Sequence, residues 1–117
     1  MAKGGRLTVH VLDVARGQPA GDLELTLFRI AGDRREALGS WRTNPDGRCG
    51  TPLLEGAAYV PGSYELVFAI GEWRARLDGE PGLYDEIPIR FRVRDAAAHL
   101  HVPLLLAPYG YSTYRGS

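Results

Sequence analysis

The sequence predicts an all-β protein, a β-sandwich with one short helix. Stretches in which apolar and polar residues alternate recur along the chain, as in strands that bury one face. Turn signals rich in glycine and proline separate them at intervals of roughly ten residues, which is typical of sandwiches. Only one stretch has helical spacing. At 117 residues and 44 % hydrophobic, the chain can form the core of one domain. We therefore expect a single domain over residues 1–117, with residues 1–5 flexible.

The expected elements follow one another closely. The first strand covers residues 6–14, with Leu7, Val9 and Val11 toward the core and Thr8, His10 and Leu12 outward. Further strands are expected at residues 23–29, 37–42, 50–54, 63–70, 87–94, 98–106 and 111–115. The helix is expected at residues 71–79, because Trp73 and Leu77 lie four apart and Gly79 can end it. Seven or eight short strands of this kind favour two packed sheets.

The stretch TNPDGR predicts a tight turn. Pro45 suits the second position of a type I turn and Gly47 the fourth. Such a turn is stiff, so Arg48 should leave it in a fixed direction.

The strand at residues 98–106 has an unusual outward face. Its even positions are apolar and suit the core: Leu100, Val102, Leu104 and Leu106. Its odd positions must then point outward: His99, His101, Pro103 and Leu105. His10 and Leu12 lie outward on the first strand, and Tyr114 can add a ring from the last. If these strands are neighbours, a second subunit is expected to cover the patch and enclose the histidines in a cleft.

Composition narrows the class of partner. Fourteen basic residues balance fourteen acidic ones, so neither nucleic acid nor a membrane is expected. No stretch approaches the roughly 20 apolar residues of a membrane span. The single cysteine, Cys49, cannot form an internal disulfide, and no apolar run near the start could act as a signal. A cytoplasmic protein with a small-molecule or protein partner is expected.

Three stretches carry a resemblance to a known family. LTVHVLDVARGQPA, RTNPDGR and HVPLLLAPYGYSTYRGS resemble the transthyretin-like 5-hydroxyisourate hydrolases of urate breakdown, over nearly the whole chain. The closing Tyr114, Arg115, Gly116 and Ser117 match the signature that separates these hydrolases from transthyretin. The resemblance implies a transthyretin- or prealbumin-like sandwich of two four-stranded sheets. It also implies a homotetramer, a dimer of dimers, with its sites at the dimer–dimer interface.

The resemblance also implies the site and its reaction. His10, Arg48 and His101 are the expected catalytic group. The expected substrate-binding residues are Tyr114, Arg115, Gly116 and Ser117. The substrate would be 5-hydroxyisourate, a purine derivative, opened by water to 2-oxo-4-hydroxy-4-carboxy-5-ureidoimidazoline. Histidine exchanges protons near neutral pH, and arginine offers a planar fork of donors to a developing negative charge. No metal or cofactor is expected.

Other interpretations of single residues stay open. His99 is a structural or supporting residue, since the family motif includes only the histidine before Val102. Zinc held between subunits by His99 and His101 is an alternative, although no third ligand is spaced with them. Cys49 should point away from Arg48 in a strand, which disfavours a nucleophile there. No Gly-x-Ser-x-Gly stretch is present, so a serine triad is not expected.

Two other classes of function remain. A carrier of the transthyretin kind would hold an apolar ligand at the same dimer–dimer interface, but should lack the histidine pair and the terminal signature. A structural or adhesion module would have a sandwich core without histidines on an otherwise apolar outer face. The residues present disfavour both classes without excluding either.

Overall fold

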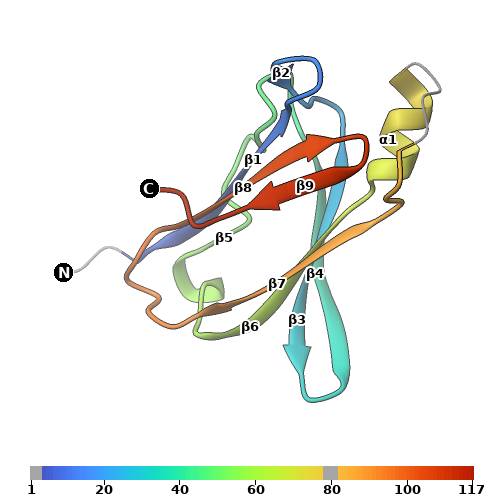
Figure 1. Cartoon of the computed structure of the whole chain (residues 1–117). Coiled ribbons are helices and arrows are strands. Elements are labelled where there is room, and N and C mark those ends of the chain that lie inside the picture. Colours follow the sequence, from blue (N-terminus) through green and yellow to red (C-terminus); the bar gives the residue numbers. More distant parts are fainter. Residues whose placement is uncertain (1–3, 78–81) are drawn as a thin grey trace.

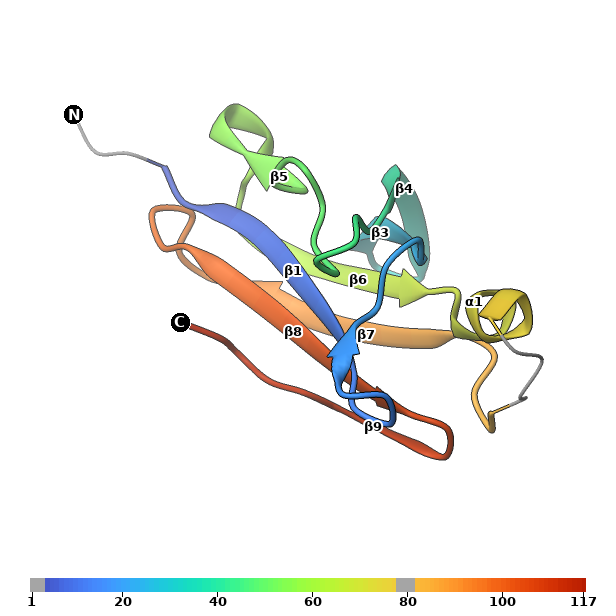
Figure 2. The same cartoon turned by 90° about the horizontal axis from the view of Figure 1, so that it is seen from above.

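A computed structural model describes residues 4–77 and 82–117 of the chain, and two β-sheets lie face to face in it (Figures 1 and 2). The first sheet has the order β2 (Gln18–Pro19), β1 (Arg6–Asp13), β8 (Leu100–Ala107) and β9 (Gly110–Thr113), and β5 (Leu54–Glu55) also pairs with β1. The second has the order β4 (Arg34–Arg42), β3 (Glu24–Ala31), β6 (Gly62–Phe68) and β7 (Ile87–Val93). A 3-10 turn, η1 (Gly56–Ala58), precedes β6. The predicted all-β sandwich is confirmed.

The sheets differ from the prediction in their number of strands. The resemblance implied two sheets of four strands each. The first sheet has five strands, because β2 and β5, with two residues each, both pair with β1. Of the strand expected at residues 50–54, only Leu54 belongs to a strand. The last strand ends at Thr113, two residues earlier than expected. Two-residue strands arise where loops meet β1, and alternation cannot reveal a strand that short.

The core lies between the sheets and uses the expected faces. Leu7, Val9 and Val11 of β1 are buried, and so are Leu104 and Leu106 of β8. Burying a side chain of this size stabilises the fold by about 1.5–3 kcal/mol. Truncating one of them to alanine would cost about 2–5 kcal/mol, because it also leaves a cavity. The predicted faces of β1 thus agree with the observed burial, and so do most positions of β8. Two positions of β8 differ: Pro103, predicted to point outward, is buried, and Leu100, predicted for the core, is half-buried.

The helix α1 (Ile70–Leu77) lies where it was predicted, but its buried face differs. Trp73 is buried and its Nε1–H donates to the carbonyl of Gly21 at 3.0 Å. Leu77 is 43 % exposed and does not share the buried side of the helix. The apolar residue buried with Trp73 is Ile70, three positions before Trp73. The expected helix end at Gly79 lies outside the described residues.

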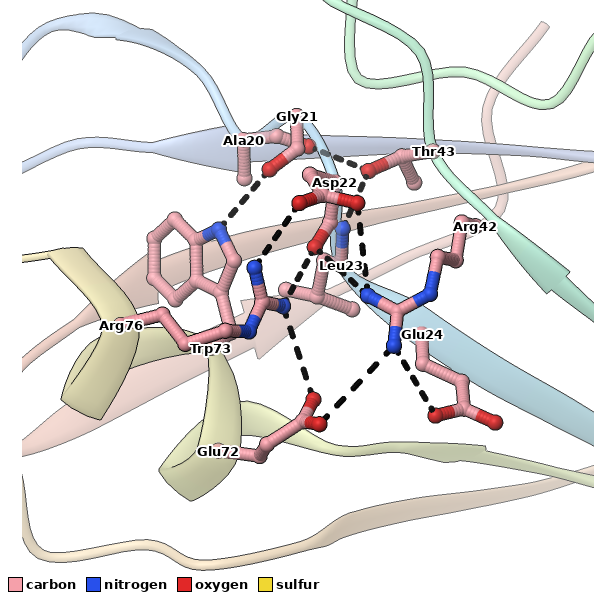
Figure 3. Close-up of polar contacts among 10 residues, drawn as sticks. All are labelled: Ala20, Gly21, Asp22, Leu23, Glu24, Arg42, Thr43, Glu72, Trp73 and Arg76. Carbon is pink, nitrogen blue, oxygen red and sulfur yellow. Dashed lines mark hydrogen bonds and ion pairs between the residues drawn. The ribbon is translucent and has the colours of Figure 1, made fainter.

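Charged residues tie α1 to the start of β3 and the end of β4 (Figure 3). We call this set the helix-end ion network; it consists of Asp22, Glu24, Arg42, Glu72 and Arg76. Arg76 donates to the Asp22 carboxylate at 2.8 Å and lies 3.5 Å from Glu72. Arg42 lies 3.3 Å from Asp22, 3.7 Å from Glu24 and 3.9 Å from Glu72. Every charge in the network therefore faces at least one opposite charge.

The N-terminal segment is described only in part. Residues 1–3, most of the stretch expected to be flexible, lie outside the described residues. Gly5 is buried and its N–H donates to the carbonyl of Ala96 at 2.7 Å. Within residues 4–77 and 82–117, no helix has the length and apolarity needed to cross a membrane.

Candidate active site

The parallel pairing of β1 with β8 brings the predicted histidines together. The register sets Thr8 beside His101 and His10 beside Pro103. The ring of His10 therefore lies diagonally across the sheet from that of His101, with 6.5 Å between ring centroids. Both side chains are on the outward face, because Val9 and Val11 beside His10 and Val102 beside His101 are buried. Leu100, the other neighbour of His101, packs against the core. The two strands are thus adjacent, as the expected histidine patch requires.

The turn at residues 44–47 delivers Arg48 to the same face. The Gly47 N–H donates to the Asn44 carbonyl at 2.8 Å, as in the predicted type I turn. Gly47 has a φ of +76°, and a Cβ there would lie 2.3 Å from the carbonyl oxygen of Val11, so only glycine fits. Arg48 then forms an isolated antiparallel bridge with His10. The turn is joined to β1, and Arg48 starts from a fixed backbone position.

The backbone of the turn also orients the His10 ring through a hydrogen bond. Its Nε2–H donates to the carbonyl of Asp46 at 3.0 Å. A carbonyl only accepts, so the proton of neutral His10 is held on Nε2 and Nδ1 keeps a lone pair. The tautomer of His10 is thereby set by its partner.

The C-terminal segment closes onto His101. The Gly116 N–H donates to the His101 carbonyl at 2.8 Å, and the two residues form an isolated antiparallel bridge. A Cβ at Gly116 would lie 2.6 Å from Cδ2 of His101 and 3.2 Å from Cγ of Pro103. Only glycine allows the chain to approach the ring this closely. In Figure 1 the C-terminal end lies beside β8, away from α1.

An open hollow of about 330 Å³ adjoins these residues, and we call it the His101 hollow. Its lining residues are Arg6, Thr8, Val9, Arg48, Cys49, Thr51, His99, His101 and Ser117. This volume is in the range of small-molecule sites, roughly 300–1,000 Å³. Two arginines line the hollow and no aspartate or glutamate side chain is among its described lining residues, so it suits an anion or a polarised carbonyl. His10 lies at its margin, beyond the lining.

The electrostatics keep both catalytic candidates neutral. Burial and then the positive charge of Arg48 lower the pKa of His10 below its ordinary value, against a smaller opposing effect of Asp46. The pKa of His101 is lowered by burial first, then by Arg48, His10 and His99. At neutral pH His10 and His101 are therefore neutral imidazoles, which can accept protons, beside the permanent guanidinium of Arg48.

Two of the four predicted substrate-binding residues point elsewhere. Ser117 lines the His101 hollow and Gly116 contacts the His101 ring. Tyr114 and Arg115 instead line a separate apolar hollow with Phe91 of β7. Arg115 also donates to the carbonyl of His99 at 3.3 Å. Within the described chain, Tyr114 and Arg115 are not brought to the His101 hollow.

Thr8 and His99 belong to the site and were not among its predicted residues. Both line the hollow, and Thr8 Oγ1 lies 2.8 Å from Nδ1 of His101 and 3.3 Å from Nε2 of His99. The sequence shows that Thr8, His99 and His101 point outward, which is a partial signal. Their meeting depends on the register between β1 and β8, which no local pattern reveals.

The structure also bears on the cysteine and on metals. Cys49 packs against the core, and burial raises the pKa of its thiol to about 11. It remains a thiol at neutral pH, which disfavours a nucleophilic role. Among residues 4–77 and 82–117, no group of three or more His, Cys, Asp or Glu side chains is placed to hold a metal ion.

Comparison with known proteins decides the family. A family model described as "HIUase/Transthyretin family" matches residues 7–116. The chain belongs to this family. Curated HIUase/Transthyretin relatives include 5-hydroxyisourate hydrolase 2 of Rhizobium meliloti, 51 % identical over the full length of both chains. Another, the 5-hydroxyisourate hydrolase of Ralstonia nicotianae, is 53 % identical over 97 % of this chain and 99 % of its own.

Solved structures of the HIUase/Transthyretin family superpose closely. The 5-hydroxyisourate hydrolase of Klebsiella pneumoniae has a TM-score of 0.83 and 34 % identity, covering 97 % of this chain and 99 % of its own. Sea bream transthyretin, solved in complex with thyroxine, has a TM-score of 0.87 and covers 95 % and 94 %, but is only 22 % identical. That likeness shows the shared fold alone.

Proposed function

We propose that this protein hydrolyses 5-hydroxyisourate to 2-oxo-4-hydroxy-4-carboxy-5-ureidoimidazoline. One observation carries the proposal: the fold brings His10, Arg48 and His101, from three separate parts of the chain, to one outward face beside a hollow of suitable size. Relatives named for this reaction, at 51 % and 53 % identity, support it. The transthyretin-like carrier is the weaker alternative, because an apolar ligand does not need two arginines and neutral imidazoles around it.

The proposed chemistry adds water to a ring carbonyl and breaks the adjoining carbon–nitrogen bond. One of the two histidines removes a proton from the attacking water, and the other assists proton delivery to the leaving nitrogen. Arg48 binds the substrate and stabilises the negative charge that develops on the carbonyl oxygen. Water, imidazole and guanidinium suffice for each of these steps.

We further propose that the active protein is a homotetramer, a dimer of dimers with its sites at the dimer–dimer interface. Leu12 and Leu105, which pair across β1 and β8, lie half-exposed on the same outward face as the histidines. Covering this face would bury apolar surface and enclose the His101 hollow. Tyr114 and Arg115 would then shape the pocket of a neighbouring subunit.

The reaction can be tested directly. 5-Hydroxyisourate is generated in place from urate by urate oxidase, and its ultraviolet decay is followed with wild type, His101→Ala or no added protein. We expect wild type to accelerate the decay and His101→Ala to lose most of that acceleration. Wild-type protein with no effect would remove the hydrolase proposal and favour the carrier.

The assembly is tested separately by deleting residues 114–117. If a partner subunit orders this segment, sedimentation should show less tetramer and activity should fall with it. Unchanged sedimentation and activity would contradict the proposed role of the tail in assembly.

A further inference from the structure

The single hydroxyl group of Thr8 lies between the rings of two histidines, His99 and His101. Its Oγ1 lies 2.8 Å from Nδ1 of His101 and 3.3 Å from Nε2 of His99. The two rings are almost parallel, with an interplanar angle of 13° and centroids 6.4 Å apart. All three side chains line the His101 hollow. The contacts form a continuous chain of hydrogen-bonding atoms from His101 to His99.

A hydroxyl can donate one proton and accept another, and this makes His101 different from His10. The carbonyl of Asp46 holds the proton of neutral His10 on Nε2, so that ring has one tautomer. Thr8 can instead accept from His101 Nδ1 while donating to His99 Nε2, or do the reverse. His101 can therefore present either a lone pair or an N–H at Nε2 without a change in its own charge.

The surrounding charges favour moving a proton away from His101. His101 is half-buried, and Arg48 and His10 face it. His99 is exposed to solvent, although Arg6 lines the same hollow and the Arg115 guanidinium lies 3.3 Å from the His99 carbonyl. Water can solvate a cation on His99 more fully than one on the half-buried His101 ring.

We propose that Thr8 connects His99 and His101 into one proton-carrying unit, with His101 as the base, Thr8 as its positioning residue and His99 as the terminal acceptor. This rests on the hydrolase function proposed above. As water attacks the carbonyl carbon, its proton moves to His101 Nε2, and the Nδ1 proton moves to Thr8 Oγ1. The Thr8 hydroxyl proton moves to His99 Nε2. His101 and Thr8 stay neutral and His99 becomes a cation. The reverse movement, with His10 assisting, returns the proton to the leaving nitrogen as its bond to carbon breaks.

Kinetics of matched variants test the unit. Thr8→Val keeps the shape and removes the hydroxyl, and should lower kcat roughly 10- to 100-fold with little change in KM. Thr8→Ser should restore most of the rate. Thr26→Val is the control, since its hydroxyl also bonds a side chain, Ser40 at 2.9 Å, but on the other sheet. It should leave kcat unchanged.

His99→Asn distinguishes proton transfer through Thr8 from a role of Thr8 in orienting the His101 ring alone. Residues that act as one unit give non-additive losses, so the double variant with Thr8→Val should be no slower than the slower single variant. Three results would each overturn the proposal. The first is a double variant whose loss of kcat is the product of the two single losses. The others are a His99→Asn variant with the wild-type kcat and a Thr8→Val variant with a kcat within about two-fold of wild type. If wild type itself does not act on 5-hydroxyisourate, the proposed function fails instead.

A measurement without substrate distinguishes these two failures. Nitrogen-15 NMR of the imidazoles reports which ring nitrogen carries the proton. In wild type, lowering the pH should move the proton of His101 between its two ring nitrogens, and Thr8→Val should abolish that response. Identical His101 signals through the titration in wild type and Thr8→Val would show that no proton is shared through Thr8.

Discussion

The molecule carries two polar clusters that differ in how completely their charges are paired. In the helix-end ion network, two arginines face three carboxylates at 2.8–3.9 Å. In the cluster around His101, Arg48 and Arg6 line a hollow with no carboxylate side chain among its described lining residues. Groups whose partners are supplied by the protein hold its elements together. Groups left facing an open hollow retain the capacity to bind and polarise a ligand.

Replacing one arginine from each cluster should give the largest contrast. Arg48→Gln removes the cation facing both histidines, and we expect kcat/KM to fall by roughly 10²–10³-fold, as for other lost oxyanion-stabilising donors. Arg42→Gln, in the helix-end ion network, should leave kcat/KM within about two-fold of wild type, because it is remote from the reacting atoms. Both are measured in the ultraviolet decay assay. Equal losses would mean that charge pairing does not distinguish the clusters.

A methyl group beside His101 should have the next largest effect. Gly116→Ala places a Cβ 2.6 Å from the ring, so the ring or the tail must move, and kcat should fall by roughly 10- to 100-fold. Gly110→Ala, at the start of β9, is the control, since a Cβ there meets nothing within 4 Å. A Gly116→Ala enzyme as fast as the Gly110→Ala enzyme would show that close contact with the tail does not position His101.

Acid should destabilise the fold through His10 and His101. The pKa of His10 and that of His101 are lowered in the folded protein by burial and by Arg48. Below the ordinary histidine pKa of about 6.5, the unfolded chain therefore binds more protons, so the free energy of unfolding falls as pH falls from there toward the lowered values. Urea unfolding at about pH 5.5 and 7.5 measures this. The difference should shrink in His101→Asn; if it does not, His101 is not a source of it.

The smallest effect is expected from the ion network. Arg76→Ala removes the ion pairs to Asp22 and Glu72, and the side chains of all three residues are at least one-third exposed to water. Such pairs contribute about 0–1 kcal/mol, and salt screens them. The loss of unfolding free energy should shrink further at high ionic strength, with kcat unchanged. A loss well above this range would show that the network is coupled to packing of α1.

The strands with one buried face could be predicted well. Alternation was enough for β1 and for most of β8, because burial of Leu7 or Leu104 turns the next residue outward. It did not predict the burial of Pro103, which the C-terminal segment approaches at Gly116. The two-residue strands β2 and β5 could not be predicted, since they exist only where a loop meets the edge of β1. The burial of Ile70 rather than Leu77 beside Trp73 depends on where α1 lies against the sheets.

The candidate site was predictable only in part. His10, Arg48 and His101 came from the resemblance to a family, and their roles stay predictions. Thr8 was visible only as an outward polar residue, because its partners depend on the register of two strands far apart in sequence. The separation of Arg115 from Ser117 across two hollows depends on where the tail turns after Thr113.

The parallel pairing of β1 with β8 sets the order in which the protein can be completed. Thr8 and His101 are 93 residues apart, and the other strands that pair with β1 among the described residues, β2 and β5, have two residues each. As the ribosome produces the chain from its N-terminus, one edge of β1 stays unpaired until β8 emerges. An open strand edge is prone to wrong pairing, and chaperones bind such intermediates. A chain released before residue 100 would therefore lack activity and expose β1 to aggregation.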